Sequence, residues 1–155
     1  MNFKFAASAI GIALVVIYAV GSGIWVSNSP GWYAALNRPT WQPPDFVFGL
    51  IWPYNFIVIG LAAVQVANNQ SKGLVVTWLL ILGLSVGFAL NWAYQFYVPH
   101  NLQIAAISLA LVALLTLPLT FVVFKTSLIY GALFLPYQLW VITAALLSNA
   151  YSKLN

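Results

Sequence analysis

The chain contains no cysteine, a single acidic residue and a single histidine, and only 4% of its residues are charged. The absence of cysteine excludes a disulfide scaffold. One aspartate and one histidine cannot fill a closed metal coordination shell. General acid and base catalysis needs positioned ionisable groups, and Asp45 and His100 do not form a catalytic pair in this sequence. The sequence therefore predicts neither a metal centre nor acid-base catalysis.

Hydrophobic residues make up 63% of the chain, more than a soluble globular domain carries. The charged residues separate five apolar stretches, each long enough to cross a bilayer as a helix, which takes about 20 residues. The predicted spans are 5–26, 46–67, 73–97, 102–124 and 128–150. The period-two alternation of a membrane β-barrel is absent. We therefore predict a single all-α membrane domain over residues 1–155, a bundle of five transmembrane helices.

The first span has a competing interpretation as a signal peptide. Ala19-Val20-Gly21 resembles a cleavage site for signal peptidase. The apolar run continues through Val26, which is long for a signal core and suitable for a first span. We favour the transmembrane helix.

The few basic residues weakly indicate an orientation. Because short loops make consecutive helices antiparallel, three lysines fall on one side of the membrane and two basic residues on the other. The first group is Lys4, Lys72 and Lys125, and the second is Arg38 and Lys153. The positive-inside rule leans towards a cytoplasmic location of the first group. No basic stripe exists that would suit a nucleic-acid backbone, so nucleic acid is not expected as a partner.

The segment 28–45, which joins the first two spans, is unlike a solvated linker. It is rich in aromatic rings, whose exposure to water is unfavourable, and in prolines, which fix the backbone without a helical ladder. The residues concerned are Trp32, Tyr33, Trp41, Pro39, Pro43 and Pro44. We therefore predict that this segment folds back onto the bundle as a structured lid over a cavity.

Alternation of helix direction places polar and aromatic residues of four spans on the lid side of the membrane. They are Trp52, Tyr54, Asn55, Asn91, Trp92, Gln95, His100, Gln103, Trp140, Ala144, Ser148 and Asn149. A cavity with many rings and few polar groups suits a flat, mostly apolar ligand.

Tryptophans at different depths have different interpretations. Trp25 and Trp78 lie near span ends, which is typical of the membrane interface. Trp140 lies near the middle of the fifth span, where an indole N–H in hydrocarbon needs a partner. We therefore predict that Trp140 faces the interior of the bundle.

Asn91 lies on the same helical face as Gln95 and has two interpretations. Its amide forms either a hydrogen bond to another helix, worth about 1 kcal/mol, or a contact to a ligand. The residues themselves favour neither interpretation.

The pair Gly83 and Gly87 has the spacing that lets two helix backbones approach closely. It indicates either a homodimer interface or a passive contact within the bundle. His100, the only histidine, is either a loop residue or a single axial haem ligand.

The lid and the cavity residues resemble the tryptophan-rich sensory protein and translocator protein family, also called TspO/MBR or the peripheral-type benzodiazepine receptor family. The resemblance covers nearly the whole chain. The matching motifs are Trp32-Tyr33-x-x-Leu36-x-x-Pro39-x-Trp41-x-Pro43-Pro44, Phe48-Gly49-x-x-Trp52, Leu90-Asn91-x-x-x-x-Phe96 and Pro136-Tyr137-x-x-Trp140-x-x-x-Ala144, with Asn149.

The resemblance implies a five-helix bundle, usually dimeric, that requires no cofactor. It implies binding of tetrapyrroles such as protoporphyrin and haem, and of benzodiazepine-type or isoquinoline carboxamide ligands, beneath the first loop. The implied lining is Tyr33, Pro43, Trp52, Phe56, Asn91, Trp140, Ala144 and Leu147. Arg38 near the mouth adds a partner for a carboxylate. With the resemblance included, the ligand contact is the favoured interpretation of Asn91.

The family also has a sterol motif at the end of the fifth helix, whose pattern Leu147, Tyr151 and Lys153 match. The resemblance thus implies a receptor or sensor of tetrapyrroles. The alternatives are an enzyme that degrades porphyrin in light, with tryptophan rings as redox groups, and a carrier of porphyrin or sterol. We expect a multi-pass protein of a bacterial cell membrane, with the lipid bilayer and a second copy of the chain as partners.

Overall fold

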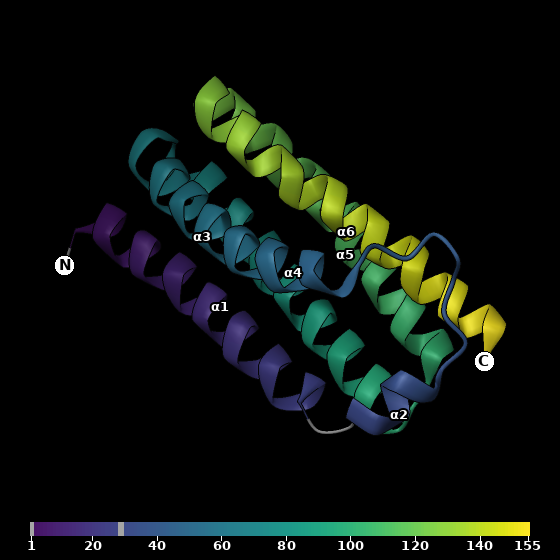
Figure 1. Ribbon diagram of the computed structural model, residues 1–155. Helices are drawn as coiled ribbons and strands as arrows, with labels where there is room; N and C mark the ends of the chain where they lie inside the picture. The colour runs from purple at the N-terminus through teal and green to yellow at the C-terminus, as the bar shows by residue number, and fades with distance from the viewer. Residues whose placement is uncertain (1, 28–29) are drawn as a thin grey trace.

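The computed structural model describes residues 2–27 and 30–155, which form six helices (Figure 1). Five of them are long and apolar enough to cross a membrane: α1 (Phe3–Val26), α3 (Asp45–Asn69), α4 (Lys72–Tyr97), α5 (Leu102–Thr126) and α6 (Leu128–Leu154). The predicted five-helix membrane bundle is confirmed. The short helix α2 (Pro30–Ala35) lies in the lid and was not predicted.

Polar side chains at the turns fix where several of the long helices begin. Asn2 Oδ1 accepts a hydrogen bond from Lys4 N at 3.2 Å, and Asn101 Oδ1 accepts one from Ile104 N at 3.1 Å. Such caps satisfy backbone donors that the first turn of a helix leaves without partners. The turns between α3 and α4, α4 and α5, and α5 and α6 are short, so these consecutive helices run antiparallel. Helices α4 and α5, and α5 and α6, pack side by side, whereas α3 and α4 barely touch because α1 packs between them.

The helices pack in a closed order in which α1 contacts α3 and α4, α4 contacts α5, α5 contacts α6, and α6 returns to α3. Small residues permit close approach in places. A Cβ atom added at Gly11 of α1 would lie 2.5 Å from the Cβ of Ala63 on α3, which leaves no room for a side chain. Ala62, Ala63 and Ala89 are almost completely buried at such contacts.

Around Pro118, which lies inside α5, neighbouring helices donate hydrogen bonds to α5 carbonyls. Gln138 Nε2 of α6 donates to Ala113 O at 3.1 Å, and Trp78 Nε1 of α4 donates to Leu119 O at 3.2 Å. Thr120 Oγ1 donates to Gln138 Oε1 at 3.1 Å. We call this group of hydrogen bonds the α5 clasp. The clasp gives hydrogen-bond partners to polar groups for which lipid hydrocarbon offers none.

Trp78, predicted to mark the membrane interface, is 1% exposed and is covered by the other helices of the bundle. The reason is its hydrogen bond to Leu119 O, which gives the indole N–H a partner inside the bundle. Trp25 is half-buried and packs edge-on against Tyr94, with ring centroids 5.7 Å apart.

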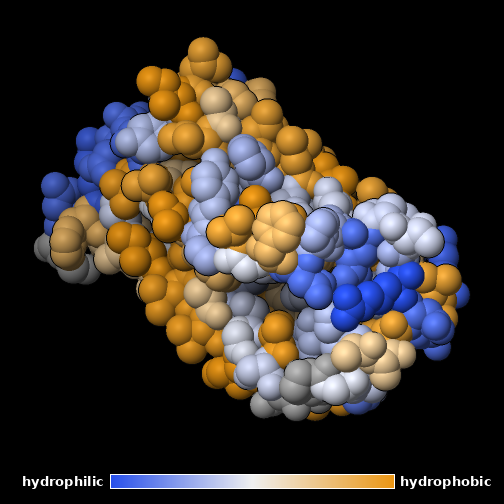
Figure 2. Space-filling model, in the orientation of Figure 1, coloured by the Kyte–Doolittle hydropathy of each residue, from blue (hydrophilic) through white to orange (hydrophobic). Residues whose placement is uncertain are grey.

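The outer surface of the long helices is apolar. Figure 2 shows hydrophobic residues over the sides of the bundle and hydrophilic residues towards its two ends. Leu80, Phe121 and Leu128 are 69%, 60% and 74% exposed, which is unfavourable in water and expected of side chains that face lipid. The protein is an integral, multi-pass membrane protein.

Candidate ligand-binding site

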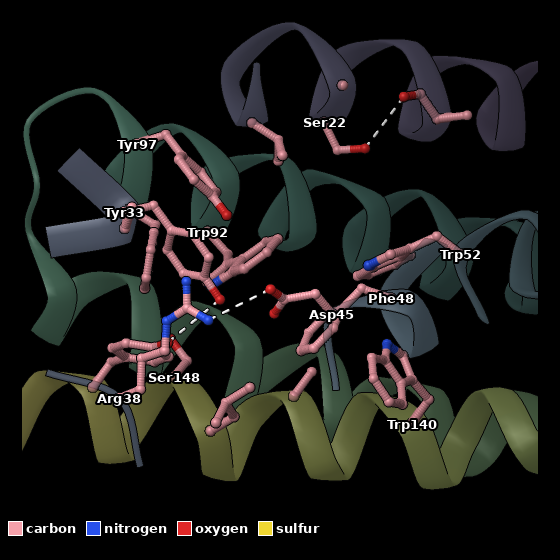
Figure 3. A pocket seen from close by; sticks show the side chains of 18 of the residues that line it. Ser22, Tyr33, Arg38, Asp45, Phe48, Trp52, Trp92, Tyr97, Trp140 and Ser148 are labelled. Atoms are coloured by element: carbon pink, nitrogen blue, oxygen red, sulfur yellow. Dashed lines mark hydrogen bonds and ion pairs between the residues drawn. The ribbon is translucent and has the colours of Figure 1, made fainter. Parts of the chain in front are cut away.

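A cavity of about 560 Å³ lies beneath the lid, on the side of the membrane predicted from helix direction (Figure 3). Helices α1, α2, α3, α4 and α6 and the lid all contribute to its wall. Its lining includes Ala19, Ser22, Gly23, Val26, Tyr33, Arg38, Asp45, Phe48, Trp52, Phe56, Trp92, Phe96, Tyr97, Trp140, Ala144, Leu147, Ser148 and Tyr151. Its size is that of small-molecule sites, which range over about 300–1,000 Å³.

Aromatic rings from three helices form most of the wall. Trp52 of α3 and Trp92 of α4 have nearly parallel rings, with centroids 6.5 Å apart and planes at 22°. Trp140 of α6 packs edge-on against Phe48 of α3, with centroids 5.2 Å apart. Figure 3 shows Trp52, Trp92 and Trp140 around the same space. The wall therefore offers ring faces to a flat ligand.

Three polar atoms in this wall are buried and have no hydrogen-bond partner among the described residues. They are Trp92 Nε1, Trp140 Nε1 and Ser148 Oγ. A buried donor without a partner costs about 1–3 kcal/mol, so three of them in one wall are unusual. Both indole nitrogens can only donate. The cavity thus suits a ligand that presents hydrogen-bond acceptors to its aromatic wall.

The mouth of the cavity carries the one ion pair found within the described residues. Arg38 Nη1 lies 3.5 Å from Asp45 Oδ2, and the two side chains are 42% and 73% exposed. The guanidinium carbon of Arg38 also lies 5.6 Å from the centroid of the Tyr33 ring. An exposed pair of this length stabilises the fold by less than about 1 kcal/mol. Arg38 is therefore free to meet an anionic group of a ligand at little cost.

The lid is held onto the bundle by side-chain contacts. The hydroxyl of Tyr151 on α6 donates to Gln42 Oε1, and Gln42 Nε2 donates to the hydroxyl of Tyr33 at 3.4 Å. The ring of Trp32 stacks on His100 with centroids 3.8 Å apart. The predicted folding back of the lid is confirmed over residues 30–45, and Asn28 and Ser29 lie outside the described residues.

A second attachment joins the lid to the end of α6. Asn37 N donates to Asn155 Oδ1 at 2.9 Å, and Asn155 Nδ2 donates to Asn37 O at 3.2 Å. The contacts that hold the lid therefore come from α6, from the end of α4 and from the α4–α5 turn.

The structure brings together seven of the residues predicted to bind a ligand, and they line the cavity: Tyr33, Arg38, Trp52, Phe56, Trp140, Ala144 and Leu147. Trp140 faces the bundle interior, as predicted. Pro43 and Asn91 are not part of the lining. Asn91 Nδ2 instead donates to Ser108 Oγ on α5 at 2.7 Å, and that hydroxyl donates to Ile104 O at 2.9 Å. Of the two interpretations of Asn91, this geometry matches the interhelical hydrogen bond.

Sequence reasoning missed the contribution of α1. Ala19, Ser22 and Gly23 follow the i, i+3, i+4 spacing of one helical face and line the cavity with small side chains. That spacing was the available signal, but it does not distinguish a cavity wall from a helix contact. Trp92 and Ser148 were predicted to lie near the cavity without being assigned to it.

The three residues of the predicted sterol motif do not share one surface. Leu147 and Tyr151 are 6% and 2% exposed and line the cavity, whereas Lys153 is exposed on the outer face of α6. Two positions along a helix differ by about 200° in direction, so Tyr151 and Lys153 cannot face the same way. Sterol binding stays a prediction.

The glycines of the predicted dimer interface have different surroundings. A Cβ atom added at Gly83 would lie 3.8 Å from Leu14 of α1, whereas one added at Gly87 would meet nothing within 4 Å. Gly87 is exposed on the outer face of α4. Dimerisation through this face stays a prediction. His100 does not line the cavity, because its ring packs on Trp32.

Comparison with known proteins agrees with this architecture. The TspO/MBR family profile matches residues 8–153. The chain is 33% identical to the tryptophan-rich protein TspO of Bacillus cereus over 124 residues, which is 80% of each chain. It is 30% identical to the translocator protein of Homo sapiens over 79% of this chain and 73% of that protein. It is 28% identical to the tryptophan-rich sensory protein of Cereibacter sphaeroides over 80% and 77% of the two chains.

The family match thus covers all five membrane helices and the lid, which are the elements that build the cavity. With identities of about a third over most of its length, the chain belongs to the TspO/MBR family.

Proposed function

We propose that this protein is a membrane receptor that binds a planar tetrapyrrole, such as protoporphyrin or haem, in the cavity beneath the lid. The observation that carries the proposal is the aromatic wall with its three polar atoms that lack partners: Trp92 Nε1, Trp140 Nε1 and Ser148 Oγ. A tetrapyrrole has large apolar faces for the rings and carboxylate oxygens for donors. Arg38 at the mouth adds a positive charge for one carboxylate.

Smaller ligands with a carbonyl, of the benzodiazepine or isoquinoline carboxamide kind, fit the same description. They combine flat aromatic rings with one strong acceptor, which the indole N–H of Trp140 would meet. Relatives of this chain bear the names sensory protein and translocator protein. These names favour sensing or carriage of a ligand. Of the two we propose sensing, because no charged side chain lies deep within the spans to drive transport. We also propose that the protein lies in a bacterial cell membrane.

Light-dependent degradation of the porphyrin is the second candidate function. The nearly parallel rings of Trp52 and Trp92 favour it, because adjacent indoles at the cavity wall are oxidisable groups next to a bound pigment. In that case the cavity would be an active site whose redox groups are indole rings.

Titration of the purified protein with protoporphyrin tests the proposal. We expect quenching of tryptophan fluorescence and saturable binding. Trp140→Phe keeps a ring and removes the N–H, so it should weaken binding about 5- to 10-fold, as the loss of one hydrogen bond does. Ser148→Ala should weaken it less. Trp25→Phe is the matched control, because Trp25 does not line the cavity, and it should bind as wild type does.

Absorbance of the complex, followed in the dark and under light, separates the two candidate functions. Stable spectra under both conditions favour the receptor. Loss of porphyrin absorbance under light, with a new product that free protein and free porphyrin do not give, favours the enzyme. Unsaturable binding, or equal affinities of Trp140→Phe and wild type, would show that protoporphyrin does not bind in this cavity.

A further inference from the structure

A second hollow lies on the outer surface of the bundle, between α5 and α6, with a volume of about 850 Å³. We call it the outer groove. Most of its wall is apolar and one end is polar. The polar end consists of Gln103, Asn149, Ser152 and Lys153. Nothing in the proposed function involves this surface.

Helix α6 presents different faces to the two sites, so the outer groove is separate from the cavity. Leu147, Ser148 and Tyr151 are buried and line the cavity. Leu146 and Asn149 are exposed and line the outer groove. One helix therefore serves as a wall for an inner site and an outer one.

Small side chains create the outer groove. Ala106, Ala110 and Ala113 lie at i, i+4 and i+7 on one face of α5, and Ala145 of α6 adds a fourth methyl group to the wall. Leu114 and other larger residues border them. Helices α5 and α6 run side by side along their length (Figure 1). The alanines leave a hollow on the lipid-facing side of this contact.

The dimensions of the outer groove match one leaflet of a bilayer. The apolar part of the groove on α5 extends from Ala106 to Leu117, over which the helix axis rises by about 17 Å at about 1.5 Å per residue. The hydrocarbon of one leaflet is about 15 Å thick. The polar end lies at the end of the bundle where α6 finishes, so the groove runs from the membrane interface towards the middle of the bilayer.

The polar end of the outer groove carries one positive charge and no negative one. Lys153 is exposed and forms no salt bridge within the described residues. The chain has one acidic residue, Asp45, which pairs with Arg38 at the mouth of the inner cavity. A second copy of the chain seated in this groove would bring the same excess of positive charge. A partner with a phosphate would supply the missing negative charge.

We propose that the outer groove binds one anionic phospholipid. An acyl chain lies over the methyl groups of Ala106, Ala110 and Ala113, and the phosphate meets the ammonium group of Lys153 at the interface. The amides of Gln103 and Asn149 form no side-chain hydrogen bonds within the described residues and are available to the headgroup. Two features of the outer groove indicate this class of ligand: its apolar part is about as long as one leaflet is thick, and its polar end carries a cation.

Native mass spectrometry of the full chain, stripped of lipid in detergent, tests this assignment. The probes are phosphatidylglycerol and phosphatidylcholine with the same acyl chains. We expect one phosphatidylglycerol per chain, bound at least about fivefold more tightly than phosphatidylcholine, which is the effect of one interfacial lysine on an anionic lipid. Lys153→Gln should abolish this preference. Ala110→Leu should weaken the binding of both lipids by filling the groove.

Two matched controls separate the groove from general effects of charge and bulk. Lys125→Gln removes an exposed lysine at the opposite end of α5, and Ala132→Leu adds bulk at an exposed position of α6 outside the groove. Both should bind lipid as wild type does. Lys153→Gln changes only an exposed side chain, so it tests the assignment even if Ala110→Leu does not fold.

Three results would overturn the proposal. Equal binding of the two lipids by wild type and Lys153→Gln would show that no headgroup is recognised. A dimer that persists without lipid and is lost in Ala110→Leu would assign the groove to a second copy of the chain. Displacement of phosphatidylglycerol by a sterol at equal concentration would assign it to a sterol.

Discussion

The α5 clasp and the cavity wall both bury polar side chains inside a membrane bundle, yet only one of them satisfies these groups internally. In the clasp, Trp78 Nε1 and both ends of the Gln138 amide have partners at 3.1 to 3.2 Å. In the cavity wall, Trp92 Nε1 and Trp140 Nε1 have none within the described residues. Tryptophan thus stabilises the fold through its indole N–H in the clasp, whereas in the cavity wall the indole N–H has no partner within the protein.

This difference gives a criterion for reading polar residues in membrane proteins. A polar group that is satisfied by its own fold contributes to stability, and its removal should affect the empty protein. A polar group that is left unsatisfied makes the empty protein less stable than it could be, and its removal should affect binding. Asn55 belongs to neither region. It is fully buried, neither of its amide atoms has a partner within the described residues, and we have no physical account of it.

Truncation in the clasp should produce the largest effect. Trp78→Ala removes a ring that is 1% exposed and a hydrogen bond to Leu119 O. We expect a loss of about 3–5 kcal/mol in the free energy of unfolding, as for other buried aromatic residues. Thermal melting in detergent should show a similar drop with and without protoporphyrin. A drop no larger than that of Trp25→Ala would show that the clasp does not stabilise the bundle.

Truncation in the cavity wall should instead act on binding. Trp52→Ala and Trp140→Ala each remove a ring face, and each should lower the affinity for protoporphyrin about fivefold or more, from the loss of about 1 kcal/mol of aromatic contact. The melting temperature of the empty protein should fall less than in Trp78→Ala, because these rings border a space that already exists. If both variants keep their affinity within a factor of about two, the cavity is not the binding site.

Asn91 precedes the cavity-lining Trp92 in sequence, but its amide, like the polar groups of the clasp, has a hydrogen-bond partner on α5. Asn91→Leu removes the hydrogen bond to Ser108 Oγ, so we expect a loss of about 1 kcal/mol in stability, with or without ligand. The increase in melting temperature on addition of protoporphyrin should equal that of wild type. Unchanged stability of the empty variant, together with loss of the ligand-induced increase, would restore the ligand contact that the family resemblance favours.

Much of this fold could be predicted from the sequence, because span length, the position of charges and the content of aromatic rings and prolines are properties of the chain alone. The five helices follow from the first two, and the lid follows from the third. Which face of a helix turns inward could not be predicted so well, because these helices are apolar all round. Trp78 was therefore predicted at the interface although it is buried, and the cavity-lining face of α1 was missed. The inward direction of the Trp140 side chain was predicted correctly, because an indole near the middle of a span is unfavourable when it faces hydrocarbon.

The smallest effect is expected at the mouth of the cavity, where Arg38 and Asp45 form an exposed pair. Neither side chain is needed to satisfy a buried group, so Arg38→Gln should change the melting temperature of the empty protein by little. If Arg38 meets a carboxylate of protoporphyrin, the variant should lose affinity by up to about fivefold at low salt, and the loss should shrink as the salt concentration rises and screens the interaction. Asp45→Asn should have the opposite sign, because it removes the competing carboxylate. Equal affinities of wild type and both variants at low salt would show that the mouth takes no part in recognition, and would leave the aromatic wall as the sole source of affinity.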